Sequence, residues 1–166
     1  MKQLVVRPAS LEDAGRIAQI YNEGIEDRIG TFETRLRTTD DVRAWFDGRH
    51  PILVVEDGGA IVAFASTSRY RARDAYAGIA EFSVYVARSA RGRGAGTAAM
   101  RALIVAARTA GFWKLVSRIF IENTASRTLM KAMGFREVGI YEKHAKLDGQ
   151  WRDVVIVERL IPENFR

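Results

Sequence analysis

The stretch that decides the fold is EFSVYV at residues 81–86, followed after four residues by RGRGAGT at residues 91–97. Apolar residues that alternate and then end in a Val-Tyr-Val run are typical of a β-strand. The glycines that follow predict a tight turn that opens a helix, and such a turn can direct several backbone N–H groups at one anion. The sequence therefore predicts a cradle for the pyrophosphate of a nucleotide-like cofactor.

The helix that this turn opens is expected to cover residues 97–110 and to end at Gly111. Its apolar residues recur with the spacing of one helix face. They are Met100, Leu103, Ile104 and Ala107.

Two hairpins are indicated by glycine-containing turns. Asp57-Gly58-Gly59 separates the strands expected at 52–56 and 60–68, and Asp148-Gly149 separates those expected at 136–146 and 151–160. The other expected elements are a strand at 4–7, a helix after Ser10, a helix capped near Thr38 or Thr39 that carries Val42, Trp45 and Phe46, a strand at 115–121 and a short helix at 123–133. The resulting order, β-α-α-β-β-β-α-β-α-β-β, predicts a mixed sheet with helices on both faces.

Composition predicts one globular domain over residues 1–166. Hydrophobic residues make up 48% of the chain and charged residues 28%, and no linker or internal repeat is visible. The chain has no cysteine and only two histidines, so neither a disulfide framework nor a metal site is expected. No apolar run approaches the roughly 20 residues of a membrane span, which favours the cytoplasm and no membrane partner.

The net charge of +6 is compatible with nucleic acid, an anionic membrane or a small polyanionic ligand. Arginines cluster at positions 69, 71 and 73 and again at 88, 91 and 93. Such clusters are often only a solvated surface, but the glycines beside the second cluster favour a ligand phosphate there.

Two well-known phosphate-binding turns do not fit residues 91–97. A dinucleotide fingerprint needs a third glycine where Thr97 stands, and a P-loop needs Gly-Lys-Ser/Thr, which the chain lacks. The pattern Arg91-x-x-Gly94-x-Gly96 after a Val-Tyr-Val strand instead resembles motif A of the GCN5-related N-acetyltransferases (GNAT).

This resemblance implies an acyl-CoA N-acyltransferase fold, with a mixed, mostly antiparallel central sheet flanked by about four helices, and acetyl-CoA as co-substrate. In that family the strand pairs with the pantetheine arm while the turn and helix N-terminus hold the pyrophosphate. A glycine-rich turn alone is more often a tight connection. The implied cofactor contacts are Ser83, Val84, Tyr85, Val86, Arg91, Gly92, Arg93, Gly94, Ala95, Gly96 and Thr97.

A second similarity lies in Asn123-Thr124-Ala125-Ser126, with Gly134-Phe135 after it. By resemblance, Asn123 would bond the pantetheine amide and Ser126 would lie near the phosphates. Asparagine is also a good helix N-cap, and both roles are compatible.

Within the family, the match narrows to the enzymes that acetylate phosphinothricin, methionine sulfoximine or arsinothricin. The similar segments are TFET at 31–34, YRARDAY at 70–76, AEFSVYV at 80–86 and DGQWRDV at 148–154. The resemblance implies a small glutamate-like amino acid as acceptor, and a homodimer.

Glu81 is the candidate base that takes a proton from the acceptor ammonium. Strand alternation places it on the same face as Ser83 and Tyr85, so it is not required by the core. The resemblance gives it the role of general base, through a water. The alternative is a strand-end glutamate that pairs with an arginine such as Arg73.

Phe32, Arg73 and Tyr76 match positions that line the substrate pocket of the subfamily. The planar guanidinium of arginine suits a carboxylate, phosphinate or arsonate-like group. Arg69 and Arg71 remain compatible with plain surface charges.

Met130 departs from the family pattern, in which this position is often tyrosine, or histidine in the phosphinothricin enzymes. Methionine cannot transfer a proton, so the acid for the departing thiolate is unassigned. Tyr85, Tyr141 and His144 are possible replacements, and each also has a structural explanation.

The sequence thus predicts an N-acetyltransferase that acts by direct transfer in a ternary complex. A protein N-terminal, ribosomal or polyamine acetyltransferase has the same cofactor site and stays open as an alternative. A basic nucleic-acid-binding module without catalysis is disfavoured because most aromatic residues fall at core-like positions.

Overall fold

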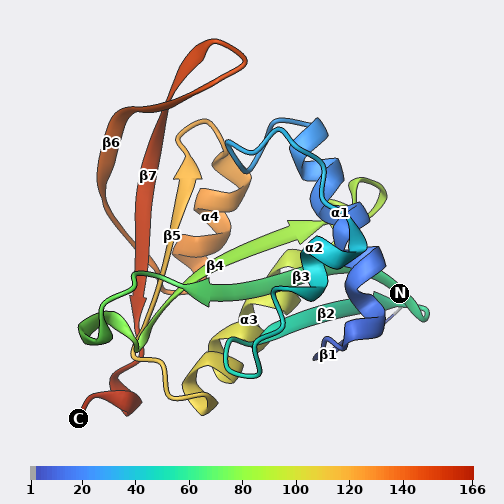
Figure 1. Ribbon diagram of the computed structural model, residues 1–166, viewed down its shortest axis with the longest axis horizontal. Coiled ribbons are helices and arrows are strands. Elements are labelled where there is room, and N and C mark those ends of the chain that lie inside the picture. Colours follow the sequence, from blue (N-terminus) through green and yellow to red (C-terminus); the bar gives the residue numbers. More distant parts are fainter. Residues whose placement is uncertain (1–2) are drawn as a thin grey trace.

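The protein is described by a computed structural model over residues 3–166. Met1 and Lys2 lie outside the described residues. One seven-stranded sheet has the order β1-β2-β3-β4-β5-β7-β6 (Figure 1). Each pair of neighbouring strands is antiparallel except β4 and β5. The strands are β1 (Leu4–Pro8), β2 (Ile52–Asp57), β3 (Ala60–Arg69), β4 (Ile79–Val86), β5 (Lys114–Phe120), β6 (Arg136–Leu147) and β7 (Gln150–Leu160).

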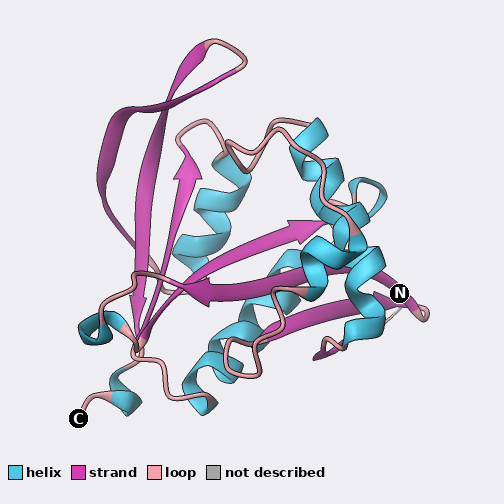
Figure 2. Ribbon diagram, viewed as in Figure 1, coloured by secondary structure: helices cyan, strands magenta, loops and turns pink. Residues whose placement is uncertain are grey.

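Helices cover the sheet on both faces (Figure 2). They are α1 (Ala14–Glu26), α2 (Thr39–Arg43), α3 (Ala95–Thr109) and α4 (Thr124–Ala132). On one face, α3 and α4 pack through Met100, Leu103 and Met130 against a core that includes Phe82 and Leu115. On the other face, α1 and α2 cover β2 and β3 around a second core that includes Ile17, Val42 and Phe64.

The parallel pairing of β4 with β5 is short. It joins Ile79 to Lys114, Ala80 to Leu115 and Glu81 to Val116, and no pairing is recorded beyond Glu81 although β4 continues to Val86. In Figure 1 the two strands visibly diverge after this point. The C-terminal half of β4 therefore has its backbone bonded to β3 on one side and open on the other.

The element order predicted from the sequence is confirmed, as is the mixed, mostly antiparallel sheet with four helices. The expected helix at 97–110 begins two residues earlier, because Gly94 in the left-handed region already caps α3. The helix expected to carry Trp45 and Phe46 was predicted too long: α2 ends at Arg43. Both aromatic side chains still pack against the second core, which is why their spacing looked helical.

Among residues 3–166, no helix is both long and apolar enough to cross a membrane.

Candidate active site

The N-terminus of α3 forms the first part of the site. Gly92 and Gly94 have φ of 79° and 87°, a region that residues with a Cβ avoid. The first α-helical bond of α3 runs from the Ala98 N–H to the Gly94 carbonyl at 3.1 Å. The N–H groups of Ala95, Gly96 and Thr97 thus precede that bond, and together with the helix dipole they favour an anion at this turn.

The open edge of β4 forms the second part. Ser117 Oγ donates a 2.9 Å hydrogen bond to the Phe82 carbonyl, which shows that the backbone of Phe82 points toward β5. Because backbone direction alternates along a strand, the N–H and C=O groups of Val84 and Val86 point the same way, where β5 has diverged. This is the arrangement that an extended, amide-containing ligand arm needs to add to the strand.

A groove of about 940 Å³, including its open mouth, connects these two parts. The predicted cofactor contacts that line it are Val84, Tyr85, Val86, Arg91, Gly92, Gly94, Gly96, Thr97, Asn123 and Ser126. It also includes Ile29 and Gly30, which sequence reasoning missed, and Ala125 and Leu129, which lie in the segment that resembles the cofactor helix but were not among the predicted contacts. Ile29 and Gly30 carried no motif of their own, whereas Leu129 follows from the apolar face of α4.

Three further predicted contacts lie outside the lining of this groove. Ser83 instead borders the passage and the cavity described below. Arg93 is exposed and donates to the Ser89 carbonyl, and the side chain of Ala95 is buried in the core. For Ala95, the backbone N–H at the start of α3 is the group that a phosphate would meet. The cofactor roles of these three residues, like those of the ten that line the groove, stay predictions.

Arg91 is held in place by a carboxylate. Its Nη1 lies 2.8 Å from Asp27 Oδ2, and Arg88 also contacts Asp27, at 2.9 Å. Hydrogen bonds from Arg88 and then Arg91 lower the pKa of Asp27 to about 2. Asp27 at the end of α1 thereby fixes two arginines of the predicted cluster beside the glycine turn.

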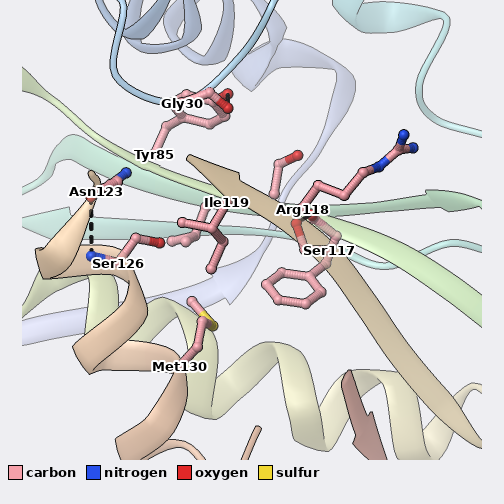
Figure 3. Close-up of a pocket in the computed structure, with 11 residues that line it drawn as sticks. Gly30, Tyr85, Ser117, Arg118, Ile119, Asn123, Ser126 and Met130 are labelled. Atoms are coloured by element: carbon pink, nitrogen blue, oxygen red, sulfur yellow. Dashed lines mark hydrogen bonds between the residues drawn. The ribbon is translucent and has the colours of Figure 1, made fainter. Parts of the chain in front are cut away.

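Asn123 caps α4, as the structural reading of its sequence suggested. Its Oδ1 accepts a hydrogen bond from the Ser126 N–H at 3.1 Å (Figure 3), and its Nδ2 donates to the Ile29 carbonyl at 3.1 Å. These two bonds orient the side chain across the groove between α4 and the loop after α1.

A narrow passage leads from the groove through the gap between β4 and β5 (Figure 3). It shares Val84 and Ser126 with the groove, and Ser83 and Arg118 with a second cavity. Met130 lines this passage and is also 1% exposed within the core cluster. No proton donor is present at this position, as the sequence showed.

The second cavity lies beside α1, on the part of that sheet face which α1 and α2 do not cover, and we call it the acceptor cavity. Its empty volume is about 1210 Å³ including its open mouth. The lining combines carboxylate, hydroxyl and aromatic side chains with one guanidinium. It includes Tyr21, Phe32, Glu33, Ser66, Ser68, Glu81, Ser83, Arg118, Phe120 and His144.

Glu81 faces this cavity and forms an ion pair. Arg118 Nη2 donates to Glu81 Oε1 at 2.7 Å, and Arg118 Nη1 lies 3.2 Å from His144 Nε2. Because arginine has no acceptor, a hydrogen bond between these two atoms requires His144 Nε2 to accept it. Glu81 thus pairs with an arginine, but the suggested partner Arg73 is wrong and the partner is Arg118. Arg118 lies on β5, two residues after Val116, which is aligned with Glu81.

The three predicted substrate contacts fall in different places. Phe32 lines the acceptor cavity and packs edge-on against Phe120 with ring centroids 4.9 Å apart. Arg73 and Tyr76 lie in the segment that connects β3 to β4, and neither is among the lining residues of the acceptor cavity. Tyr76 contacts Tyr70 edge-on instead, so the substrate roles of Arg73 and Tyr76 stay predictions.

The three possible replacement acids also separate. Burial raises the pKa of the Tyr85 phenol, which packs between Tyr21 and Phe64 and donates to the Gly30 carbonyl, so Tyr85 is a poor proton donor. Tyr141 is 53% exposed and borders a neighbouring depression. Of the three, only His144 lines the acceptor cavity.

Arg118 was missed from the sequence. In the sequence, Arg118 is only a polar residue within an otherwise apolar strand. Its contact with Glu81 depends on the register between β4 and β5, which the sequence does not show. Ser66 and Ser68 were missed for the same reason, since alternation along β3 predicts a face but not what that face borders.

The fold and the two connected cavities define a protein that binds an acyl-CoA and a second substrate. The chain belongs to the GNAT acetyltransferases: the model of the family described as Acetyltransferase (GNAT) family matches residues 17–135. It is an acyltransferase that uses acetyl-CoA, as this family membership establishes.

Individual relatives agree with this assignment. The chain is 33% identical to the phosphinothricin N-acetyltransferase of Streptomyces coelicolor over 164 residues, which cover 95% of this chain and 96% of the relative. It is 28% identical to the L-methionine sulfoximine/L-methionine sulfone acetyltransferase of Salmonella typhimurium, with 97% and 96% covered.

Among solved structures, the chain is similar to a GNAT superfamily phosphinothricin acetyltransferase from Sinorhizobium meliloti in complex with acetyl-CoA. The TM-score is 0.89 at 27% identity, and the match covers 95% of this chain and 88% of the other. The predicted fold, family and co-substrate are thereby confirmed.

Proposed function

We propose that this enzyme acetylates the α-amine of a small glutamate-like amino acid of the phosphinothricin, methionine sulfoximine or arsinothricin type, and so detoxifies it and confers resistance. The observation that carries the proposal is the acceptor cavity, which the Glu81 carboxylate lines and which shares Ser83 and Arg118 with the passage beside the cofactor groove. The names of the relatives support an amino-acid acceptor.

The chemistry assigned to the site is direct transfer in a ternary complex. Acetyl-CoA supplies an activated acetyl group as a thioester. Glu81 takes a proton from the acceptor ammonium, through a water, because only the neutral amine is a nucleophile. The amine nitrogen then bonds to the acyl carbon as the C–S bond breaks, and the net products are the acetamide, the CoA thiol and one proton.

The open backbone of β4 supplies the electrostatic part of this mechanism. N–H groups at Val84 and Val86 point into the gap beside the passage. We assign them to the thioester carbonyl as an oxyanion site, since a fixed N–H group stabilises negative charge that develops on that oxygen.

The walls of the acceptor cavity support a small acceptor. Phe32 in the loop after α1 and His144 in the β6–β7 hairpin face each other, with ring centroids 6.3 Å apart. Arg28 Nε and Asp148 Oδ2, 2.8 Å apart, connect the same two segments. Two segments joined in this way leave less room for a peptide chain than an open groove would.

The decisive experiment measures thiol release from acetyl-CoA by the purified protein with a panel of acceptors. The panel contains phosphinothricin, methionine sulfoximine, arsinothricin, spermidine and N-terminal peptides. We expect turnover with at least one glutamate-like amino acid. Turnover with peptides or spermidine alone would assign the enzyme to the protein or polyamine acetyltransferases, and salt-sensitive binding to random DNA without turnover would favour a nucleic-acid-binding module.

We also propose that the enzyme works as a cytoplasmic homodimer without nucleic-acid or membrane partners, as the resemblance to its subfamily implies. Exposed apolar side chains on β6 and β7 are compatible with a protein contact. They include Val138, Ile140, Tyr141 and Trp151. Light scattering during size-exclusion chromatography tests the dimer, and a monomer at micromolar concentration contradicts it.

A further inference from the structure

The acceptor cavity is lined by two carboxylates and one guanidinium. Among the described residues that line it, Glu33 and Glu81 are acidic, and Arg118 is the residue with a permanent positive charge. Its side chain is 40% exposed, so the guanidinium is open to an incoming ligand. A zwitterionic acceptor whose ammonium lies at Glu81 therefore meets one strong cation in the same cavity.

Arg118 retains donors for such a ligand. A guanidinium carries five N–H donors. Among the described residues, Nη2 of Arg118 contacts Glu81 and Nη1 contacts His144. The Nε–H and a second hydrogen on each terminal nitrogen stay available, and a guanidinium that is held by two neighbours loses little further freedom when it binds a carboxylate.

Glu81 and Arg118 are close enough for the two charged groups of one α-amino acid to reach both. The amine nitrogen and carboxyl carbon of such a molecule are bonded to one carbon atom and lie about 2.5 Å apart. An ammonium at Glu81 thus has its carboxylate within a few ångströms, and the contact of 2.7 Å between Arg118 Nη2 and Glu81 Oε1 places the guanidinium in that range. Arg73, on the β3–β4 connection, is not among the cavity lining.

We propose that Arg118 binds the α-carboxylate of the acceptor and so restricts the enzyme to free α-amino acids. The inference rests on the proposed function and deepens it. Each charged group of the acceptor then lies beside a side chain of opposite charge: its ammonium beside Glu81 and its carboxylate beside Arg118. An amine without an adjacent carboxylate forms only the first of these two contacts. Peptide N-termini and polyamines lack that carboxylate and are rejected, because they leave the guanidinium with no added partner.

The test compares two acceptors that differ in this one group. L-Methionine sulfoximine and its α-carboxamide are assayed with wild type, Arg118→Met and Arg118→Lys. For wild type we expect a strong preference for the free acid. Arg118→Met should lower kcat/KM for the acid by about 10- to 100-fold, mainly through KM, as loss of a charge-assisted hydrogen bond predicts, while kcat/KM for the amide changes less than threefold.

Arg118→Lys should retain part of the preference, because it keeps the charge but loses the planar fork. Arg101→Met, which removes an exposed charge of α3, is the matched control and should leave the ratio of acid to amide unchanged. Arg73→Met tests the competing assignment.

The outcomes separate two failures. Equal losses for acid and amide in Arg118→Met would reduce Arg118 to a partner that positions Glu81, and a selective loss in Arg73→Met would move the carboxylate site to Arg73; either result overturns the inference alone. A wild type that acetylates neither the acid nor the amide nor any other amino acid overturns the proposed function and the inference together.

Discussion

Arg28 Nε lies 2.8 Å from Asp148 Oδ2, although 120 residues separate them in the chain. This ion pair joins the loop after α1 to the tip of the β6–β7 hairpin, and both segments contribute side chains to the acceptor cavity. Both residues have positive φ, 57° and 51°, in turns that direct the two side chains toward each other. The contact thus joins two segments that border the cavity without using the hydrophobic core.

Loss of this ion pair should affect acceptor binding more than stability. Asp148→Asn keeps a residue that tolerates positive φ but removes the charge. Exposed pairs contribute little, so the free energy of unfolding should change by less than about 1 kcal/mol. KM for the amino acid should rise severalfold while KM for acetyl-CoA stays constant in steady-state assays. Asp40→Asn, which removes an exposed pair with Arg43, is the control; an equal rise in both KM values in Asp148→Asn would contradict the prediction.

Glu81→Gln tests the general base. Turnover should fall most at low pH, where the acceptor is an ammonium and depends on Glu81, and the deficit should narrow as pH approaches the pKa of the amine. Acetyl-CoA affinity, measured by calorimetry, should be nearly intact because Glu81 lies outside the cofactor groove. Equal activity of mutant and wild type at each pH would remove Glu81 from the mechanism.

Two glycines of the cofactor turn should respond oppositely to a methyl group. A Cβ at Gly96 would meet only Leu129 and Val86, at 3.4 and 3.5 Å, so Gly96→Ala should fold and gain up to about 1 kcal/mol as a helix residue. The methyl would lie in the cofactor groove, and KM for acetyl-CoA should rise. Gly94→Ala has free space but φ of 87°, and should lose about 1–2 kcal/mol of unfolding free energy.

Urea unfolding and acetyl-CoA titration measure these two effects separately. A Gly96→Ala variant with unchanged affinity would mean that the helix N-terminus is not the phosphate site.

Met130→His should fold but be less stable. Met130 is buried both in the core and in the wall of the passage. An imidazole with few hydrogen-bond partners there should cost about 1–3 kcal/mol. The cost should grow below pH 6.5, the ordinary pKa of histidine, because the buried form resists protonation. Leu103→His, in the core away from the passage, is the control and should lose more; equal thermal shifts in both would show that the passage gives position 130 no relief.

The lowered pKa of Asp27 should make part of the stability of the fold sensitive to acid. Its folded-state pKa of about 2 is below the ordinary 3.8 because Arg88 and Arg91 donate to it. The ionised carboxylate therefore stabilises the fold above about pH 4, and this contribution is lost as pH falls toward 2. Asp27→Asn should be less stable than wild type at pH 5 in low salt, and the difference should shrink between pH 4 and 2. The exposed Glu163→Gln is the control; a difference that does not depend on pH would contradict the assignment.

The cofactor half of the site could be predicted because its signal is local. Left-handed glycines, the strand before them and the helix after them are consecutive in the chain, and ten of the predicted contacts line one groove. The acceptor half could not, because it is assembled from β3, β4, β5 and the β6–β7 hairpin. Arg118 meets Glu81 only through the β4–β5 register, and His144 reaches it through a bulge that includes Lys143 at φ of 46°.

The early end of the β4–β5 pairing also bears on the order of binding. The cofactor groove borders α3 and α4, whereas the acceptor cavity borders α1, and both adjoin the passage. Each of the two cavities has its own open mouth, so neither substrate has to pass through the cavity of the other. Initial-rate measurements should therefore give the pattern of random addition, in which either substrate binds first and neither product must wait for the other to leave.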